Sequence, residues 1–394
     1  MISNLFAAQS YTALQAVLPL YIREMGGDNA LAGTMAGAFT LVMMLARPAV
    51  GMLMDRAKRH RIMLLGGAAF FLNTLAYLLA NGIASLFAVR MLYGASTCLY
   101  TLATSTVVAD SVPSERLVDG IGYFSISSSI AGAIGPFTGT FLYEHFSFQV
   151  LFAGLALISL AGTILLLFMS NVNKPAVPRK NDASEKHTAP KGIEAVLHVV
   201  EPTVILPAAV SGLTVIGYSA VTNFLPLYGV SQGIENISVF FIINGLCVVV
   251  ARLLSNRLLG RVGTARAMIL GLILIALGYL VMALAANFAL IAAAGLLFGF
   301  GIGIASPMIN ALVFQLSPPE RRGRANATYG LFNDVGNGLG AILWGNLSQT
   351  IGFVPSYLLA MAAPLLALLI YVVLLRRKTA DQTENIVEKT LGPG

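Results

Sequence analysis

Long uninterrupted apolar segments are the feature that most limits how this chain can fold. The 394-residue sequence is 57% hydrophobic and only 10% charged, whereas soluble domains carry about 25% charged residues. An apolar run of about 20 residues is long enough to cross a bilayer as a helix. Twelve such runs lie at about 5–22, 30–54, 62–81, 83–107, 120–143, 148–170, 203–228, 236–258, 266–286, 289–315, 325–350 and 354–375. The sequence therefore predicts a polytopic membrane protein and excludes a soluble enzyme or nucleic-acid-binding protein.

The runs indicate helices and not strands. Each run is continuous, whereas outer-membrane strands alternate in polarity at every second residue. Lipid offers no hydrogen-bond partners, so the backbone must satisfy its own polar groups within each span. We expect an all-α fold of twelve transmembrane helices. A polar segment separates six helices from six, which predicts a bundle over 1–170, a cytoplasmic linker over 171–201, a second bundle over 202–375 and a cytoplasmic tail over 376–394.

Positive charge is concentrated on one side of the predicted spans. The chain has 24 Lys and Arg residues and a formal net charge of +7, and most of these residues fall in the even-numbered loops, the linker and the tail. Because Lys and Arg accumulate in cytoplasmic loops, both termini are expected in the cytoplasm of an inner- or plasma-membrane protein. The first apolar run is interpreted as a span and not as a cleaved signal.

Residue types that support enzyme or metal chemistry are sparse. Cys98 and Cys247 lie inside apolar runs, and the four histidines are scattered through loops. The phosphate-binding pattern G-x-x-x-x-G-K-[ST] is absent, so ATP bound in this chain is not expected to supply energy. The sequence contains neither a potassium-filter motif nor a long run of gating arginines, which argues against a channel. We expect no enzyme activity, no cofactor, no metal site and no nucleic-acid partner.

The two halves of the sequence repeat one another. An offset of 205 residues aligns 47–67 with 252–272, and the tetrapeptide LPLY at 18–21 recurs at 225–228, an offset of 207. The coincident residues include Arg47 with Arg252, Gly66 with Gly271, Glu115 with Glu320, and Gly135 with Gly340. The pattern predicts two pseudo-symmetric six-helix bundles of the same orientation. This arrangement is typical of transporters that rock two bundles about a site near the midplane.

Three motifs carry a family resemblance. The loop after the second run reads Gly51-x-Leu53-x-Asp55-Arg56-x-Lys58-Arg59-His60-Arg61. The fourth run contains Arg90-x2-Tyr93-Gly94, and the fifth contains Gly122-x8-Ala131-x3-Gly135-Pro136-x2-Gly139-Thr140. Together they resemble the major facilitator superfamily, and within it the twelve-helix drug:proton antiporter branch. Lys58, Ala131 and Thr140 stand where the family patterns have glycine.

The resemblance implies a major facilitator fold and a secondary transporter that works by alternating access. The fifth-run motif implies export over uptake, with Gly135, Pro136 and Gly139 as gating residues. Physically, Gly135 and Pro136 bend the helix and allow a neighbouring backbone to approach closely. This bend either seals the two halves on one side or serves packing alone.

Ionisable residues inside the spans are the strongest candidates for function, because a charge in the bilayer is costly. Asp334 and Arg47 lie in the eleventh and second runs, which face each other in the family fold. We expect them to pair, so that protonation of Asp334 couples a proton to the conformational change; a permanent ion pair or a capped acid is the alternative. The resemblance also places Asp55 near the start of the eleventh helix, as part of a cytoplasmic latch.

Arg90 in the fourth run is expected either to attract an anionic substrate group or to tune a proton carrier, and otherwise to be a structural hydrogen-bonding residue. Uncharged polar side chains follow several other runs, and these either make interhelical hydrogen bonds or contact substrate. The predicted substrate contacts are Tyr11, Gln15, Arg90, Tyr93, Ser211, Thr214, Tyr218, Thr222, Asn310 and Asn333.

These features predict a monomeric proton antiporter that exports a drug-like molecule or amphipathic metabolite. Its expected partners are the substrate, protons and the lipid bilayer. Uptake or facilitated diffusion of a sugar or other metabolite is the first alternative. A non-transporting membrane sensor or scaffold is the second alternative.

Overall fold

The computed structural model describes residues 1–56, 58–111, 117–168, 200–318 and 321–375, without the side chains of 55–56, 109–110, 117–126, 255–262 and 375. Within these ranges the regular elements are all helical, and the predicted all-α fold of twelve helices is confirmed. The tail from residue 376 and most of the predicted linker lie outside the described residues.

The first six spans are α1 (Ile2–Glu24), α2 (Asn29–Arg56), α3 (Arg59–Ala76) with the 3₁₀ turn η1 (Tyr77–Leu79), α4 (Ile83–Ser111), α5 (Leu117–His145) and α6 (Phe148–Leu167). The others are α8 (Ile205–Gln232) after the turn η3 (Pro202–Val204), α9 (Val239–Val262), α10 (Thr264–Ala283), α11 (Phe288–Leu316), α12 (Arg322–Thr350), and α13 (Phe353–Ala360) with α14 (Ala362–Ile370) and η5 (Tyr371–Leu375).

Short polar residues begin several of these helices. Asp28 accepts a hydrogen bond from the Leu31 N–H at 2.7 Å before α2, and Asn287 accepts one from the Leu290 N–H at 3.1 Å before α11. These side chains satisfy backbone donors that have no partner within the first helical turn. The caps therefore fix where the apolar runs begin as helices.

The chain divides into two compact units. The first comprises Met1–Thr188, Ala220–Gly245 and Ala341–Gly352, and the second comprises Ala189–Ser219, Leu246–Gly340 and Phe353–Gly394. The division follows spatial packing, so its boundaries fall inside the continuous helices α8, α9 and α12. The predicted division of the sequence at the linker stays a prediction.

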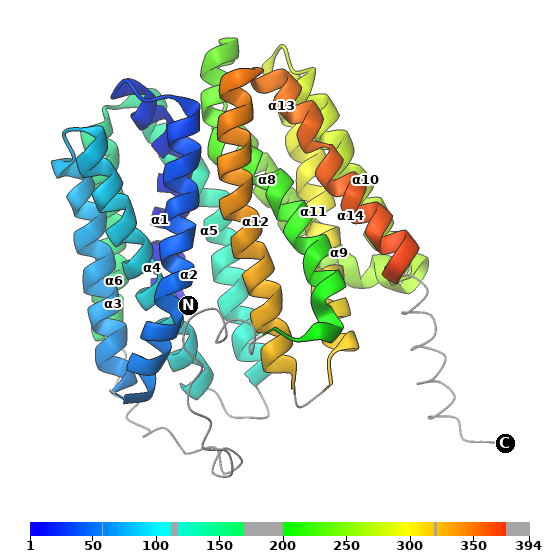
Figure 1. Ribbon diagram of the computed structural model, residues 1–394, viewed down its shortest axis with the longest axis horizontal. Coiled ribbons are helices and arrows are strands. Elements are labelled where there is room, and N and C mark those ends of the chain that lie inside the picture. Colours follow the sequence, from blue (N-terminus) through cyan, green and yellow to red (C-terminus); the bar gives the residue numbers. More distant parts are fainter. Residues whose placement is uncertain (57, 112–116, 169–199, 319–320, 376–394) are drawn as a thin grey trace. The chain divides into compact units, whose positions relative to one another are not determined.

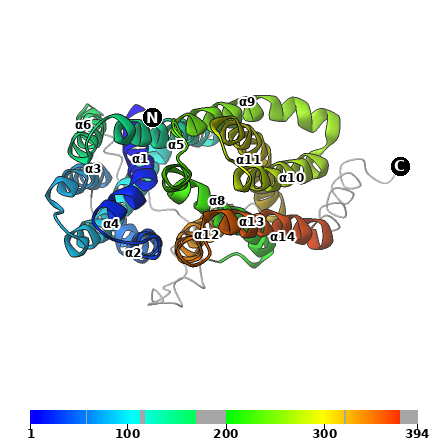
Figure 2. The ribbon, with the colours of Figure 1, turned by 90° about the horizontal axis from the view of Figure 1, so that it is seen from above.

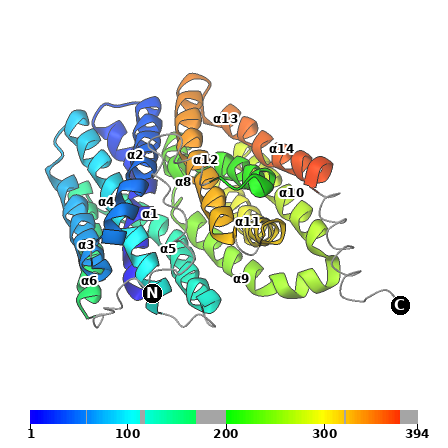
Figure 3. The same ribbon diagram turned by 60° about the horizontal axis from the view of Figure 1, so that its bottom comes forward.

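In the first unit, α1 packs against α5 and α6, and α2 packs against α4. The view along the helices in Figure 2 shows α3 between α4 and α6. In the second unit, α10 packs against α11 on one side and against α13 and α14 on another. Figure 3 shows α13 and α14 running on in nearly the same direction (compare Figure 1).

Eight of the helical spans are long and apolar enough to cross a membrane, among the residues that the structure describes. The spans of α1 and α12 fall below that level because amide and hydroxyl side chains interrupt them, including Gln15 in α1 and Asn333 in α12. A polar side chain in lipid is costly, so such faces are expected to contact protein or water. Both helices carry predicted substrate contacts.

The internal repeat is visible in how helices pack. A Cβ atom on Gly66 would lie 3.1 Å from the Tyr100 Cα, so α3 and α4 touch through their backbones. The same contact occurs between α10 and α11, where a Cβ on Gly271 would lie 2.9 Å from the Ala305 nitrogen. Gly271 follows Gly66 by 205 residues, and Ala305 follows Tyr100 by the same 205 residues, which is the offset that aligns the two halves.

A second contact repeats in the same way. A Cβ atom on Gly135 of α5 would lie 2.6 Å from the Gln9 carbonyl oxygen of α1, and one on Gly340 of α12 would lie 2.6 Å from the Ile216 carbonyl oxygen of α8. Gln9 and Ile216 are separated by 207 residues, the offset of the two LPLY segments. Each half therefore uses the equivalent glycine to bring two helices together.

Candidate functional site

The predicted site residues are distributed over both units, and each unit is considered by itself. The first contains Tyr11, Gln15, Arg47, Asp55, Arg90, Tyr93, Gly135, Pro136, Gly139 and Thr222. The second contains Ser211, Thr214, Tyr218, Asn310, Asn333 and Asp334.

Arg90 is buried inside the first unit, with 1% of its surface exposed. Its guanidinium carbon lies 4.2 Å from the centre of the Phe39 ring of α2 and 5.9 Å from that of Tyr93. Such cation–π contacts are worth about 2 kcal/mol when they are desolvated. The charge therefore has two aromatic neighbours.

The spacing of the fourth-run motif explains this arrangement. Arg90, Tyr93 and Gly94 lie three and four residues apart, so they share one face of α4. The Tyr93 ring lies 6.0 Å from Phe39, and a Cβ on Gly94 would lie 2.8 Å from the Phe39 carbonyl oxygen. Gly94 thus lets α2 approach closely enough for Arg90 to stack on Phe39.

Arg90 lacks the negative partner that a buried cation normally has. Its Nε and Nη1 atoms are buried and make no hydrogen bond, and no carboxylate of the described residues forms an ion pair with it. An isolated buried charge costs several kcal/mol. Cation–π stacking offsets only part of this cost, so the guanidinium is suited to bind a negative group.

Two tyrosines extend this polar cluster. The Tyr77 and Tyr93 hydroxyls are buried and make no hydrogen bond of good geometry, although Tyr77 lies close to the Arg90 guanidinium and Tyr93 lies close to the Thr74 side chain. Neither Tyr77 nor Phe39 is among the site residues predicted from the sequence. Tyr77 occupies a single 3₁₀ turn where α3 ends, and no sequence motif marks it.

Phe39 contacts both Arg90 and the predicted contact residue Tyr11. The Tyr11 and Phe39 rings stack with 5.7 Å between their centres, and the Arg90 guanidinium carbon lies 4.2 Å from the centre of the same Phe39 ring. Phe39 is 1% exposed and Tyr11 is partly exposed. The Phe39 ring therefore connects the predicted contact residue Tyr11 with the buried guanidinium.

Gln15, four residues after Tyr11 in α1, forms a hydrogen-bonded pair of amides with Asn223 of α8. Gln15 donates a hydrogen bond from Nε2 to the Asn223 Oδ1 at 3.3 Å, and the Asn223 amide donates to the Thr222 hydroxyl at 3.4 Å. Asn223 was missed because the predicted polar stripe of its helix follows Thr222, one residue earlier. An amide inside an apolar run was the available signal.

In the second unit, two predicted contact residues lie together. The Ser211 hydroxyl donates to the Asn333 Oδ1 at 2.6 Å, which joins α8 to α12. Tyr218 lies 6.1 Å from the Phe298 ring, and the Thr214 hydroxyl bonds the Val210 carbonyl of its own helix. Within the predicted polar stripe of α8, Ser211 therefore makes a hydrogen bond to another helix, whereas Thr214 makes its hydrogen bond within α8.

Asn310 of α11 has a buried Oδ1 atom without a hydrogen-bond partner among the described residues. An unsatisfied buried acceptor is costly, so this amide can receive a donor from a ligand. The predicted contact at Asn310 stays a prediction.

The structure describes only part of the residues that are predicted to couple protons to the conformational change or to latch the cytoplasmic side. Arg47 and Asp334 are both partly buried, and they belong to different units. Asp55 lies in the last turn of α2, and its side chain lies outside the described residues. The predicted Arg47–Asp334 pair and the predicted Asp55 latch therefore stay predictions.

The antiporter-like motif of α5 packs against α1. A Cβ atom on Gly135 would collide with the Thr12 hydroxyl oxygen, and one on Gly139 would lie 2.7 Å from the Ala13 carbonyl oxygen. Pro136 is buried between these two glycines. The motif thus brings two backbones together inside the first unit, as its small residues predict.

Gly135→Ala is expected to lower the thermal unfolding midpoint and slow transport, because overpacking costs about 1–3 kcal/mol. Gly132→Ala is the matched control one turn earlier in α5, where a Cβ would meet nothing within 4 Å. The control should leave the midpoint unchanged or raise it, since Ala favours a helix over Gly by about 1 kcal/mol. Equal midpoints for the two variants, measured by differential scanning fluorimetry, would contradict the packing role.

Segments from the second half of the sequence complete the first unit at the end where α1 turns into α2. The Asn29 amide donates to the Ser348 hydroxyl at 3.2 Å, and a Cβ on Gly33 would lie 3.0 Å from the Gly345 Cα. Glu144 at the end of α5 accepts hydrogen bonds from the Ser238 N–H at 3.3 Å and from its hydroxyl at 2.9 Å. A carboxylate is favourable there, because the N-terminus of α9 carries the partial positive charge of the helix dipole.

The comparison with known sequences establishes the family. The sequence profile of the Major Facilitator Superfamily matches residues 1–263 and 235–392. The chain belongs to the Major Facilitator Superfamily, as the motifs predict. It is a multi-pass membrane transporter of small molecules and not an enzyme.

Relatives named for export and multidrug resistance match over nearly their full length. The Staphylopine export protein of Staphylococcus aureus is 24% identical over 88% of this chain and 87% of that protein. The Multidrug resistance protein MdtG of Klebsiella pneumoniae is 24% identical over 95% and 92%. A solved peptide transporter POT in complex with sulfate is 15% identical, with a TM-score of 0.76 over 95% of this chain and 93% of that one, and it supports the fold alone.

Proposed function

We propose that the protein exports a small organic solute across the inner or plasma membrane in exchange for protons. The single observation that carries this proposal is the near-full-length similarity to proteins named for export and multidrug resistance. The positive-inside pattern supports cytoplasmic termini. On this topology the turn between α1 and α2 faces outside.

The substrate is proposed to be amphipathic and to carry an anionic group. Arg90 is a buried cation without a carboxylate partner among the described residues, and Tyr11 stacks on the Phe39 ring that also contacts Arg90. The Gln15–Asn223 and Ser211–Asn333 pairs offer neutral amide and hydroxyl groups. A ligand with one negative charge and an apolar body would match both features.

Proton coupling is proposed to act through Asp334 and Arg47. Neutralising a carboxylate weakens its attraction to an arginine, so protonation of Asp334 would favour one arrangement of the two bundles over the other. Asp55 is proposed to contribute to closure at the cytoplasmic end. A monomer contains every residue that this scheme requires.

Counterflow in proteoliposomes, with and without a pH gradient, tests the proposal. An inside-acidic gradient in vesicles with the outer face inward should drive substrate accumulation, and dissipation of the gradient should leave only exchange. Equal net transport without a gradient would indicate facilitated diffusion instead. Transport with protons in the same direction would indicate uptake.

Closure of the transport pathway at its outer end is proposed to depend on Glu144, which accepts two hydrogen bonds from Ser238 just before α9. Glu144→Ala should increase maleimide labelling of an Ile237→Cys probe about fivefold, the factor that corresponds to about 1 kcal/mol. Ile237 is 4% exposed and adjoins Ser238, and both native cysteines would be replaced by alanine.

Glu235→Ala is the matched control for this labelling. Glu235 lines the same surface cavity as Glu144 and makes no hydrogen bond among the described residues. Its removal should leave the labelling rate unchanged. An equal rise in both variants would point to surface charge and would contradict the proposed role of Glu144 in closure.

A further inference from the structure

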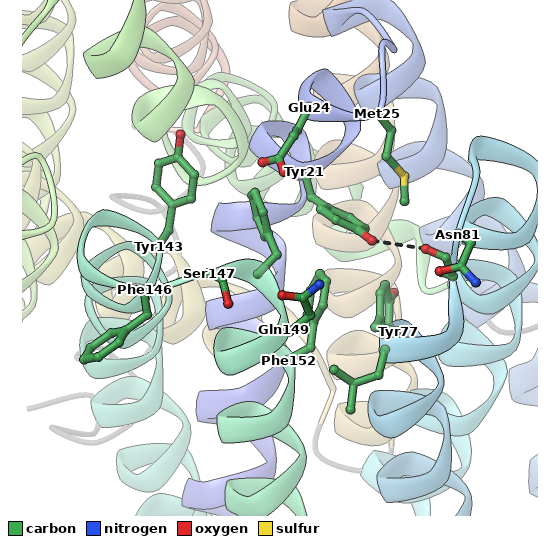
Figure 4. Close-up of a pocket in the computed structure, with 13 residues that line it drawn as sticks. Tyr21, Glu24, Met25, Tyr77, Asn81, Tyr143, Phe146, Ser147, Gln149 and Phe152 are labelled. Carbon is green, nitrogen blue, oxygen red and sulfur yellow. Dashed lines mark hydrogen bonds between the residues drawn. The ribbon is translucent and has the colours of Figure 1, made fainter.

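The first unit contains a pocket that the transport proposal does not use. It has a volume of about 440 Å³ and lies between the ends of α1, η1, α5 and α6. Pockets that hold small molecules have volumes of about 300–1,000 Å³. We call it the tyrosine pocket, after Tyr21, Tyr77 and Tyr143 in its lining (Figure 4).

Aromatic rings form a continuous wall of this pocket. The Tyr21 ring lies 4.7 Å from Phe148 and 4.9 Å from Phe152, and Tyr143 lies 5.3 Å from Phe148. The Tyr21 hydroxyl is held by the Ala80 carbonyl at 3.1 Å, as Figure 4 shows. Aromatic faces carry partial negative charge and attract cations.

Glu24 supplies the one carboxylate in the pocket lining. Its negative charge acts on both the Tyr21 and the Tyr143 hydroxyls, so it lies within electrostatic reach of both rings. Among the described residues it makes no hydrogen bond or ion pair of its own. Arg23 precedes it in sequence and acts on Tyr143, but it does not line the pocket.

We propose that the tyrosine pocket binds a monovalent organic cation with an apolar body, such as an aromatic amine or a quaternary ammonium compound. The carboxylate neutralises the ligand charge, and the rings cover its apolar surface. Asn81 and Gln149 add amide groups for a polar substituent. An anion would be repelled by Glu24, and a neutral apolar ligand would leave the carboxylate unused.

This pocket is chemically opposite to the Arg90 cluster. Tyr77 belongs to both, because it lines the pocket and its ring meets Tyr93 edge-on at 5.7 Å. A cation near Arg90 would be repelled, whereas a cation near Glu24 is attracted. The two places should therefore bind different ligands and respond to different substitutions.

Calorimetric titration of phenyltrimethylammonium into the purified full-length protein tests this site. Saturable binding is expected, with tert-butylbenzene, the neutral compound of the same shape, binding at least about tenfold more weakly, which corresponds to about 1.4 kcal/mol. Glu24→Gln should weaken binding of the cation by a similar factor. Tyr21→Leu should also weaken it, provided that thermal melting confirms the fold of that variant.

Two control variants establish whether the cation binds in this pocket. Asp28→Asn removes an exposed carboxylate four residues along the chain that does not line the pocket, and it should leave the affinity unchanged. Glu235→Gln, which removes an exposed carboxylate outside the pocket lining, should also leave it unchanged. Calorimetry measures binding and not transport, so failure of the transport proposal would not affect this result. Equal affinities for wild type and Glu24→Gln, or equal losses in Glu24→Gln and Asp28→Asn, would overturn the proposal.

Discussion

Arg90→Met is expected to abolish transport while leaving the protein as stable as the wild type or more stable. Methionine keeps much of the side-chain volume and removes a buried charge that has no carboxylate partner among the described residues. Replacing buried charges by apolar groups of similar size is often neutral or stabilising. We expect a fall of about 100-fold or more in substrate exchange, as for loss of a central charged contact.

This combination distinguishes a binding role from a structural one. If Arg90 only supported the bundle, Arg90→Met would lower the unfolding midpoint together with transport. Phe39→Leu provides a second test, because it removes the cation–π contact and retains the charge. That variant should be less stable than the wild type and should keep measurable transport. Normal exchange in Arg90→Met would remove Arg90 from the mechanism.

Asp334→Asn is expected to uncouple transport from the pH gradient. The amide is nearly the same size as the carboxyl group but cannot gain or lose the proton. Gradient-driven accumulation should therefore fall by at least about tenfold, which corresponds to a coupling free energy of about 1.4 kcal/mol. Counterflow of the same substrate, which needs no net proton movement, should continue.

The neighbouring residue Asn333 offers a contrast to Asp334. Asn333→Ala removes the acceptor of the Ser211 hydroxyl and should reduce counterflow and gradient-driven transport in parallel. Both assays would use the same proteoliposomes, so differences in insertion cancel. Full gradient-driven accumulation by Asp334→Asn would show that the proton is carried elsewhere.

The sequence predicted the helices well because lipid imposes a simple length requirement on each span. It also predicted the duplication, and the equivalent contacts at Gly66 and Gly271 confirm it. The positions of Gly135 and Gly139 correctly indicated a close helix contact. That contact is with α1 inside the same unit.

The surroundings of Arg90 could not be predicted in the same way. Helical spacing identifies residues on one face of α4, but it does not indicate which neighbouring helix they meet. Phe39 and Tyr77 are ordinary aromatic residues in apolar runs, and only the packing of α2 and η1 brings them to the guanidinium. Glu144 was missed because its partner Ser238 lies 94 residues away in the chain.

The helices α8, α9 and α12 each contribute residues to both compact units, and the changes occur at Ser219–Ala220, Gly245–Leu246 and Gly340–Ala341. Three continuous helices therefore belong partly to one unit and partly to the other. Glycine stands at two of these three boundaries, and a residue without a Cβ atom offers the least steric resistance to bending of a helix.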